Sequence, residues 1–270
     1  MTPGSREFDV LRVRDGDAAR SAPAAGVREH VVVEEPLEIR LDGEPLAVTM
    51  RTPGHDAELA VGFLVTEGIV PSPAAIATAA HCDENENVVE VRTAEGAAVE
   101  PPEPRRFYST SSCGVCGKAT IDAVRVNAPH LGGDATRITP SLLSALPARL
   151  REVQELFDAT GALHAAGLFD ADGRLVCARE DVGRHNAVDK LVGWAAIHER
   201  SLAGHVLVVS GRAGFEIVQK AAVARIPIVA AISGPSSLAI DLARECGLTL
   251  VAFLRGGTMN VCSAPERVTG

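Results

Sequence analysis

The second half of the chain alternates between short apolar strands and helices, and this pattern restricts the fold more than any other feature of the sequence. Nearly unbroken apolar runs at 206–209, 227–232 and 248–254 are separated by segments with helical spacing at 215–225 and 237–246. Parallel strands need a crossover between them, so this succession predicts a largely parallel sheet covered by helices. We therefore predict a three-layer α/β sandwich.

The pattern extends upstream with the same spacing. Strands are predicted at 163–169 and 175–179 around the turn Asp170–Gly173, and helices at 142–157 and 186–198. These elements belong to a larger α/β domain that we place at residues 106–270.

The first hundred residues have a different pattern. Asp42–Gly43 between two apolar runs predicts a β-hairpin, residues 56–66 have helical spacing, and 87–92 reads as a strand. The prolines that follow, at 101, 102 and 104, end regular structure. We therefore predict a small α+β domain at 27–105, so the whole chain is α+β with an α/β domain inside it. Residues 1–26 lack apolar periodicity and predict a disordered N-terminal arm.

Composition excludes several classes of function. Thirty-five acidic residues against 26 basic ones leave a formal charge of -9, which argues against a nucleic-acid partner. No apolar run approaches the roughly 20 residues that span a bilayer, so no membrane role is expected. The charged N-terminus does not resemble a secretory signal, and a cytoplasmic location follows. Six cysteines in such a chain are too few for a disulfide scaffold.

Three loops at one edge of the predicted sheet suggest a binding site. Ligands of open α/β sheets bind beyond the carboxyl ends of the strands. The loops Ser210–Arg212, Ser233–Ser237 and Arg255–Thr258 follow three such strands. Each loop alone is explained by turn formation, but three together predict a site for an anionic ligand, with Arg212, Ser233 and Arg255 as contacts.

The run Glu180-Asp-Val-Gly-Arg-His-Asn-Ala-Val-Asp-Lys190 stands at a strand-to-helix transition. Arg184 and His185 can donate hydrogen bonds into one site at the helix start, and we assign both to ligand binding. The alternative is structural: Asp181 caps the helix, Asp189 and Lys190 are solvated surface, and Asn186 with His185 is satisfied polar packing. His164 stands alone, and an isolated histidine is more often structural.

The segment Ser111-Ser-Cys-Gly-Val-Cys-Gly-Lys118 carries a C-x-x-C motif before a helix-like stretch. A helix start and nearby cations lower a thiol pKa, so Cys113 and Cys116 are the candidate nucleophiles. A structural zinc site would need a second pair of ligands, which the four isolated cysteines do not supply. A dithiol redox pair and a persulfide carrier both remain open from the residues alone.

Ordered blocks across residues 30–268 resemble a known family. They include RTPG at 51–54, SSCGVCGK at 111–118, HAAGLFD at 164–170, EDVGRHNAVDK at 180–190 and FLRGGTMNV at 253–261. On these motifs the chain is similar to the formate dehydrogenase accessory sulfurtransferase family, also called the FdhD/NarQ family.

This resemblance implies a sulfurtransferase that takes sulfur from a cysteine desulfurase and passes it to the molybdenum bis(molybdopterin guanine dinucleotide) cofactor of formate dehydrogenase. It implies that Cys113 carries the persulfide with Cys116 as its partner. It also implies a cofactor-binding segment formed by Phe253, Leu254, Arg255, Gly256, Gly257 and Thr258.

The resemblance has three further consequences. It implies a homodimer and a larger domain similar to the cytidine deaminase-like fold, although the deaminase zinc motif is absent and no zinc is expected. Guanine nucleotides such as GDP should bind as surrogates for the cofactor. Because sulfur must meet both a donor and an acceptor, we expect residues 105–118 to be mobile.

Overall fold

The computed structural model describes residues 4–12, 26–83, 85–97, 99 and 128–270. Cys113, Cys116, the segment 105–118 and the expected domain boundary near residue 105 lie outside the described residues. Within the part of the chain that the structure describes, no helix has the length and apolar character needed to cross a membrane.

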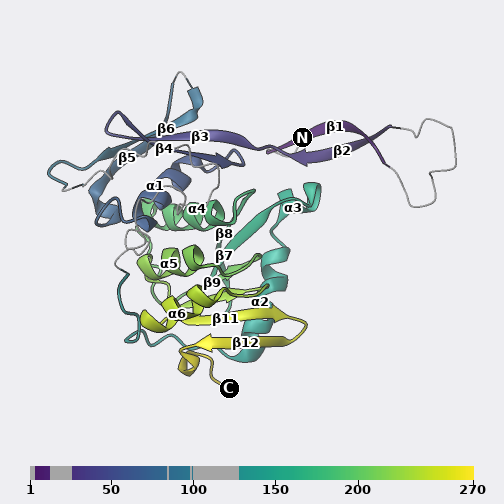
Figure 1. Ribbon diagram of the computed structural model, residues 1–270, viewed down its shortest axis with the longest axis vertical. Helices are drawn as coiled ribbons and strands as arrows, with labels where there is room; N and C mark the ends of the chain where they lie inside the picture. Colours follow the sequence, from purple (N-terminus) through teal and green to yellow (C-terminus); the bar gives the residue numbers. More distant parts are fainter. Residues whose placement is uncertain (1–3, 13–25, 84, 98, 100–127) are drawn as a thin grey trace.

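A six-stranded mixed sheet forms the centre of the larger domain (Figure 1). Its strands are β7 (His164–Phe169), β8 (Leu175–Asp181), β9 (Val206–Val209), β10 (Ile228–Ala231), β11 (Thr249–Arg255) and β12 (Thr258–Ser263), in the order β12-β11-β10-β9-β7-β8. Only β9, β10 and β11 pair in parallel. The expectation of a largely parallel sheet is therefore wrong. Strand β7 runs antiparallel to both β8 and β9, and β12 runs antiparallel to β11.

Helices cover both faces of this sheet, which confirms the three-layer α/β arrangement. On one face lie α4 (Arg184–Ile197), α5 (Phe215–Val223) and α6 (Ser237–Glu245), and on the other lies α2 (Pro140–Arg151). Successive strand residues point to opposite faces, so Val208 packs toward α2 whereas Val209 packs toward the α4–α6 layer. Both faces are apolar, as the unbroken strand pattern predicts.

The helix predicted at 142–157 is divided in two. α2 ends at Arg151, and α3 (Glu155–Thr160) begins after Gln154, whose backbone is not helical. The carboxylate of Glu180 accepts hydrogen bonds from the amides of Leu156 and Phe157, at 3.1 and 2.9 Å. These bonds satisfy free N–H groups at the start of α3 and so support a new helix start there.

A four-stranded sheet and one helix make up the smaller part. The strands are β3 (Glu35–Leu41), β4 (Glu44–Arg51), β5 (Ile76–Cys82) and β6 (Asn85–Thr93), in the order β4-β3-β6-β5, and the helix is α1 (Asp56–Thr66). The hairpin at Asp42–Gly43 and the helix at 56–66 are confirmed. Strand β5 was not predicted, because three of its seven residues are alanines, which carry little strand signal.

Helices α1 and α4 lie between the two sheets and cross at very short distance (Figure 1). A Cβ atom on Gly62 would lie 1.8 Å from the carbonyl oxygen of Asp189, and one on Gly193 would lie 1.7 Å from that of Glu58. Glycine is therefore required at both positions. A single apolar core, with Ile39 from one sheet and Leu207 from the other, runs through this layer. The two parts of the chain are thus packed on each other.

The expectation of disorder throughout residues 1–26 is wrong for part of that range. Residues Ser5–Leu11 form β1, which pairs antiparallel with β2 (Gly26–Val32) in a ribbon that projects from the four-stranded sheet (Figure 1). The alternation of Phe8 and Val10 with charged residues is the signal that could have revealed this strand.

Candidate functional site

The loops predicted to bind a ligand do meet at one edge of the six-stranded sheet. β9, β10 and β11 are parallel, so the residues after them, including Gly211 and Ser233, share this edge. β7 runs the opposite way and begins here with His164, which pairs with Asp181 at the end of β8. Helix α4 starts three residues later. We call this edge, with the residues around it, the carboxyl edge.

Phe253 is the most unusual residue of the carboxyl edge. Its φ of 52° lies in the left-handed region, which a residue with a large side chain seldom adopts. Its amide donates to the carbonyl oxygen of Ser233 at 3.1 Å, and the ring lies 2.9 Å from where a Cβ on Gly234 would stand. The guanidinium of Arg255 lies 5.9 Å from the ring centroid. An exposed aromatic ring is thus held between two predicted ligand-binding residues, at some cost in backbone strain.

The rest of the predicted cofactor segment forms the tip of a hairpin between β11 and β12. Gly256 and Gly257 have φ values of 59° and 77°, so the turn itself requires glycine at both positions. Thr258 donates a side-chain hydrogen bond to the carbonyl of Arg255 at 3.0 Å. The side chain of Leu254 is fully buried in the core under α2, so it is not available for a ligand contact.

A group of basic side chains surrounds Gly211. A Cβ on this glycine would stand 3.3 Å from Nδ1 of His164 and 3.9 Å from Cδ of Arg184. Burial lowers the pKa of His164, and Arg184 and Arg212 lower it further against the opposing effect of Asp181. The Nε atom of Arg184 is buried and, among the described residues, has no hydrogen-bond partner. The sequence predicts only a structural role for His164. Its place beside Arg184 depends on the pairing of β7 with β8 and β9, which no local motif reveals.

His185 faces inward. It is 2% exposed, and its Nε2 atom lies 3.7 Å from a carboxylate oxygen of Glu216, at the start of α5. The structure therefore brings Arg184 to the carboxyl edge beside Gly211 and packs its neighbour His185 between two helices.

The other polar residues of the 180–190 run are structural. Asp181 is fully buried and binds Nζ of Lys190 at 2.7 Å, the amide of Gly183 at 2.7 Å and the side-chain amide of Asn186 at 2.9 Å. It also accepts from the amide of Thr52, at 3.1 Å, in the turn before α1. These contacts fix the start of α4 against the smaller sheet. The expectation that Asp189 and Lys190 are solvated surface is wrong, because both are buried. Ligand binding by Arg184 and His185 stays a prediction.

Three of the described cysteines, Cys177, Cys246 and Cys262, are poor nucleophiles. Burial raises the pKa of Cys177 to about 11, against the lowering effect of Arg179. Burial also raises the pKa of Cys246, with Glu245 adding to the shift, and that of Cys262, with Arg244 opposing. A raised pKa means less thiolate at neutral pH. The candidate sulfur carriers are therefore still the C-x-x-C cysteines, Cys113 and Cys116.

The described residues that flank 100–127 lie away from the carboxyl edge. On one side, the turn 94–97 follows a hydrogen bond from Ala94 to Ala75. On the other, the amide of Leu131 donates to Cys246 at the end of α6, at 2.6 Å. The C-terminal end of α6 is opposite the carboxyl edge, because the helix runs back along the sheet toward the start of β11.

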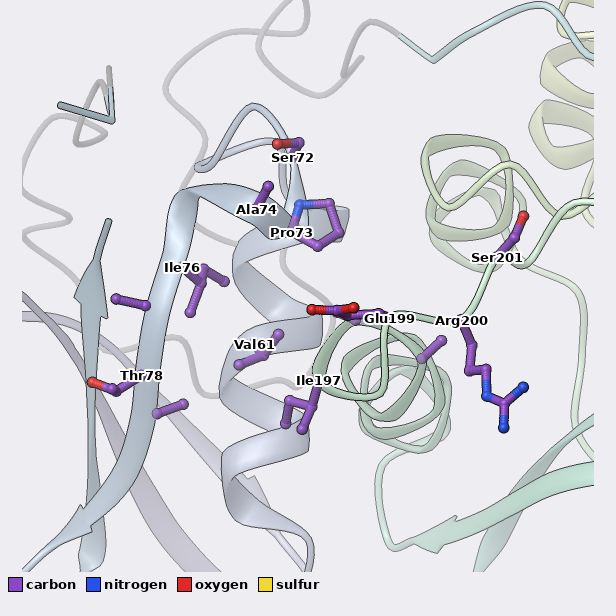
Figure 2. A pocket seen from close by; sticks show the side chains of 14 residues that line it. Val61, Ser72, Pro73, Ala74, Ile76, Thr78, Ile197, Glu199, Arg200 and Ser201 are labelled. Carbon is purple, nitrogen blue, oxygen red and sulfur yellow. The ribbon is translucent and has the colours of Figure 1, made fainter. Parts of the chain in front are cut away.

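A cavity of about 780 Å³ opens near this opposite edge, between β5, the middle of α1 and the C-terminal end of α4 (Figure 2). Figure 2 shows Val61 of α1 and Ile197 at the end of α4 next to each other on its wall. Most of its lining is small and apolar, with Glu199 and Arg200 among the few charged residues. Its lining includes none of the residues predicted to bind the anionic ligand.

Comparison with known proteins identifies the family. The sequence profile of the FdhD/NarQ family matches residues 32–269. The chain belongs to this family. The match covers the C-x-x-C segment, the 180–190 run and the β11–β12 hairpin, and it leaves out β1.

Individual relatives agree with the family match. The chain is 53% identical over 270 residues to the sulfur carrier protein FdhD of Streptomyces coelicolor, covering 96% of this chain and 94% of the relative. It is 50% identical over 256 residues to the protein of that name from Mycobacterium tuberculosis, covering 89% and 92%. A crystal structure of a Desulfotalea psychrophila protein assigned as a formate dehydrogenase accessory protein superposes with a TM-score of 0.80 at 28% identity, covering 99% of this chain and 100% of that one.

Proposed function

We propose that this protein is a sulfur carrier and sulfurtransferase that serves formate dehydrogenase. Cys113 accepts a sulfur atom from the persulfide of a cysteine desulfurase. The protein then delivers it to the molybdenum bis(molybdopterin guanine dinucleotide) cofactor, which binds at the carboxyl edge. Membership of the FdhD/NarQ family and the relatives named sulfur carrier protein support this proposal.

The observation that carries the binding half of the proposal is the buried Nε of Arg184. A buried guanidinium N–H without an acceptor costs about 1–3 kcal/mol, and a phosphate oxygen would satisfy it. Arg212 and Arg255 are exposed at the ends of β9 and β11, which lie on either side of β10 at the same edge of the sheet. A protein with a formal charge of -9 can thus hold a phosphorylated dinucleotide through short-range contacts with guanidinium groups.

The chemistry of transfer needs an accessible thiolate. The Cys113 thiolate attacks the terminal sulfur of the donor's persulfide, the S–S bond of the donor breaks, and the donor leaves as a thiolate. The terminal sulfur must gain two electrons if it is to be delivered as sulfide. The Cys116 thiolate can supply them by attacking the Cys113 sulfur, which releases sulfide and leaves a Cys113–Cys116 disulfide.

Reach is compatible with this assignment. Cys113 is 14 residues from Val99 and 15 from Ala128, so an extended chain can carry it up to about 45–50 Å from either. The strands between the two edges of the sheet have at most seven residues, or about 23 Å.

We further propose that the protein works in the cytoplasm as a homodimer.

The binding half is tested by calorimetry with GDP. Arg212→Gln and Arg255→Gln should each weaken binding by about 1.5–3 kcal/mol, the worth of a hydrogen bond to a charged group. Arg174→Gln is the matched control, because Arg174 is 74% exposed on the turn between β7 and β8. Equal affinity in all three variants would place the nucleotide elsewhere.

A dithiol oxidoreductase is the competing function for the C-x-x-C motif, and a chaperone that merely holds the cofactor is the non-enzymatic one. A single Cys113→Ala variant separates all three in an activation assay with apo-formate dehydrogenase and a desulfurase. Sulfur transfer predicts that activation is lost with GDP binding retained. A chaperone predicts no loss. A redox protein predicts that an added dithiol replaces the function of the variant.

A further inference from the structure

His164 occupies a position at the carboxyl edge that its place in the sequence did not suggest. It is the first residue of β7, and β7 lies between β8 and β9 in the sheet. Ala166 and Leu168, two and four residues later, pack into the core beneath α4. The period of two along a strand therefore turns His164 toward the same face, where α4 begins.

The groups around His164 come from every element packed against it. Asp181 is its partner across the β7–β8 pair, Arg184 opens α4, and Arg212 follows β9. Burial is the main cause that lowers the pKa of His164, Arg184 and Arg212 lower it further, and Asp181, which binds Lys190 at 2.7 Å, opposes them. Together these effects favour a neutral imidazole in the free protein.

An anion that enters this group changes the balance. It brings negative charge next to Arg184 and Arg212, so it offsets the repulsion that these two guanidiniums exert on a protonated His164. Within the part of the chain that the structure describes, the buried Nε of Arg184 has no acceptor, and a phosphate oxygen could fill that role. A half-buried imidazole beside it can then donate a hydrogen bond to the same ligand.

We propose that His164 is a ligand-binding residue of the carboxyl edge, which takes up one proton from solvent when a phosphate group binds between Arg184 and Arg212. The inference rests on the proposed function and adds a residue and a linked proton to it. The imidazolium then forms a charge-assisted hydrogen bond to a phosphate oxygen. Gly211 leaves space for the His164 ring, because a Cβ atom at position 211 would lie only 3.3 Å from Nδ1 of His164.

The sign of the pH dependence follows from linkage. The ligand raises the pKa of His164, so the complex holds more protons than the free protein between the two pKa values. Affinity for the ligand therefore falls as pH rises through that window. Each unit by which the ligand raises the pKa corresponds to a change of about tenfold in affinity.

The test is GDP calorimetry on the full chain between about pH 5.5 and 8, the range in which histidine titrates. We expect His164→Gln to weaken binding about tenfold at the acid end and much less at the alkaline end. The protonation of GDP itself changes with pH in the same way for both proteins. The ratio of the wild-type affinity to the His164→Gln affinity at each pH therefore reports only the titration of the protein. Wild type should also take up a proton, measured in buffers of different ionisation enthalpy, that His164→Gln does not. His198→Gln, an exposed histidine at the far end of α4, is the matched control.

The outcomes separate this inference from the proposed function. If Arg212→Gln weakens GDP binding but His164→Gln follows the wild-type pH profile, the role of His164 is refuted and the site stands. If wild type gives no heat with GDP, both are refuted. Should His164→Gln fail to fold, the imidazole resonance of His164 in wild type decides, since an unchanged titration curve with GDP would refute the proton uptake.

Discussion

Lys190→Met tests whether the buried polar residues of the 180–190 run are structural. Lys190 is 1% exposed, its Nζ lies 2.7 Å from Asp181, and it also donates to the carbonyl of Thr52 at 2.8 Å. The variant leaves Asp181 as a buried charge without its partner, which costs about 3–5 kcal/mol. For a chain of this size we expect the melting temperature to fall by about 6–10 °C. Circular dichroism measures the melt.

Two further variants sharpen this prediction. Arg174→Met breaks an exposed ion pair with Asp172 of 2.9 Å, and we expect it to change stability by less than about 0.5 kcal/mol. The double variant Asp181→Asn with Lys190→Met removes both buried charges and should recover part of the loss. The reasoning is refuted if Lys190→Met melts like Arg174→Met, or if it keeps its stability and loses GDP.

Three other expectations follow from the structure. Gly193→Ala would place a Cβ 1.7 Å from a backbone carbonyl and should destabilise the protein by more than about 3 kcal/mol in a denaturant melt, whereas Gly133→Ala, with open space around it, should not. Burial acts to raise the pKa of Glu58, but Arg179 lowers it to about 2, so this pair stabilises the fold above about pH 4.5 and the stability is lost as pH falls toward 2. Glu58→Gln should remove up to about 3 kcal/mol of that acid dependence, measured as unfolding free energy against pH. Cys113→Ala should abolish activation of formate dehydrogenase at an unchanged melting temperature, and residual activity would move the persulfide to another cysteine.

The fold could be predicted where local pattern and tertiary packing agree. The apolar strands at 206–209 and 228–231 and the helix at 56–66 lie within the ranges that the sequence predicts. Strand direction could not be predicted, because the apolar pattern of β7 is the same whichever neighbour it pairs with. The break before α3 was also hidden, because the carboxylate that supports the new helix start belongs to Glu180, which is distant in sequence.

In the candidate site, too, features set by local sequence could be predicted and features set by distant contacts could not. The three glycine-rich loops were found from sequence, because parallel strands place their carboxyl ends together. The 180–190 run was harder to interpret, because a polar motif at a helix start looks the same whether it meets a ligand or a second sheet. Asp181 and Asn186 meet backbone groups around β4, at Thr52 and Met50. His164 was missed because only the antiparallel pairing of β7 brings it beside Arg184.

Mass spectrometry of the intact protein, after incubation with a cysteine desulfurase and cysteine, tests the central claim most directly. The account predicts one added sulfur atom that maps to Cys113, is removed by a reducing dithiol, and does not form in Cys113→Ala. Cys177→Ala serves as the control, because the raised pKa of that buried thiol should keep it from accepting sulfur. Added sulfur that persists in Cys113→Ala would contradict the proposal that Cys113 carries the persulfide. So would a Cys116→Ala variant that gains no sulfur, because the attack that releases sulfide cannot occur in it.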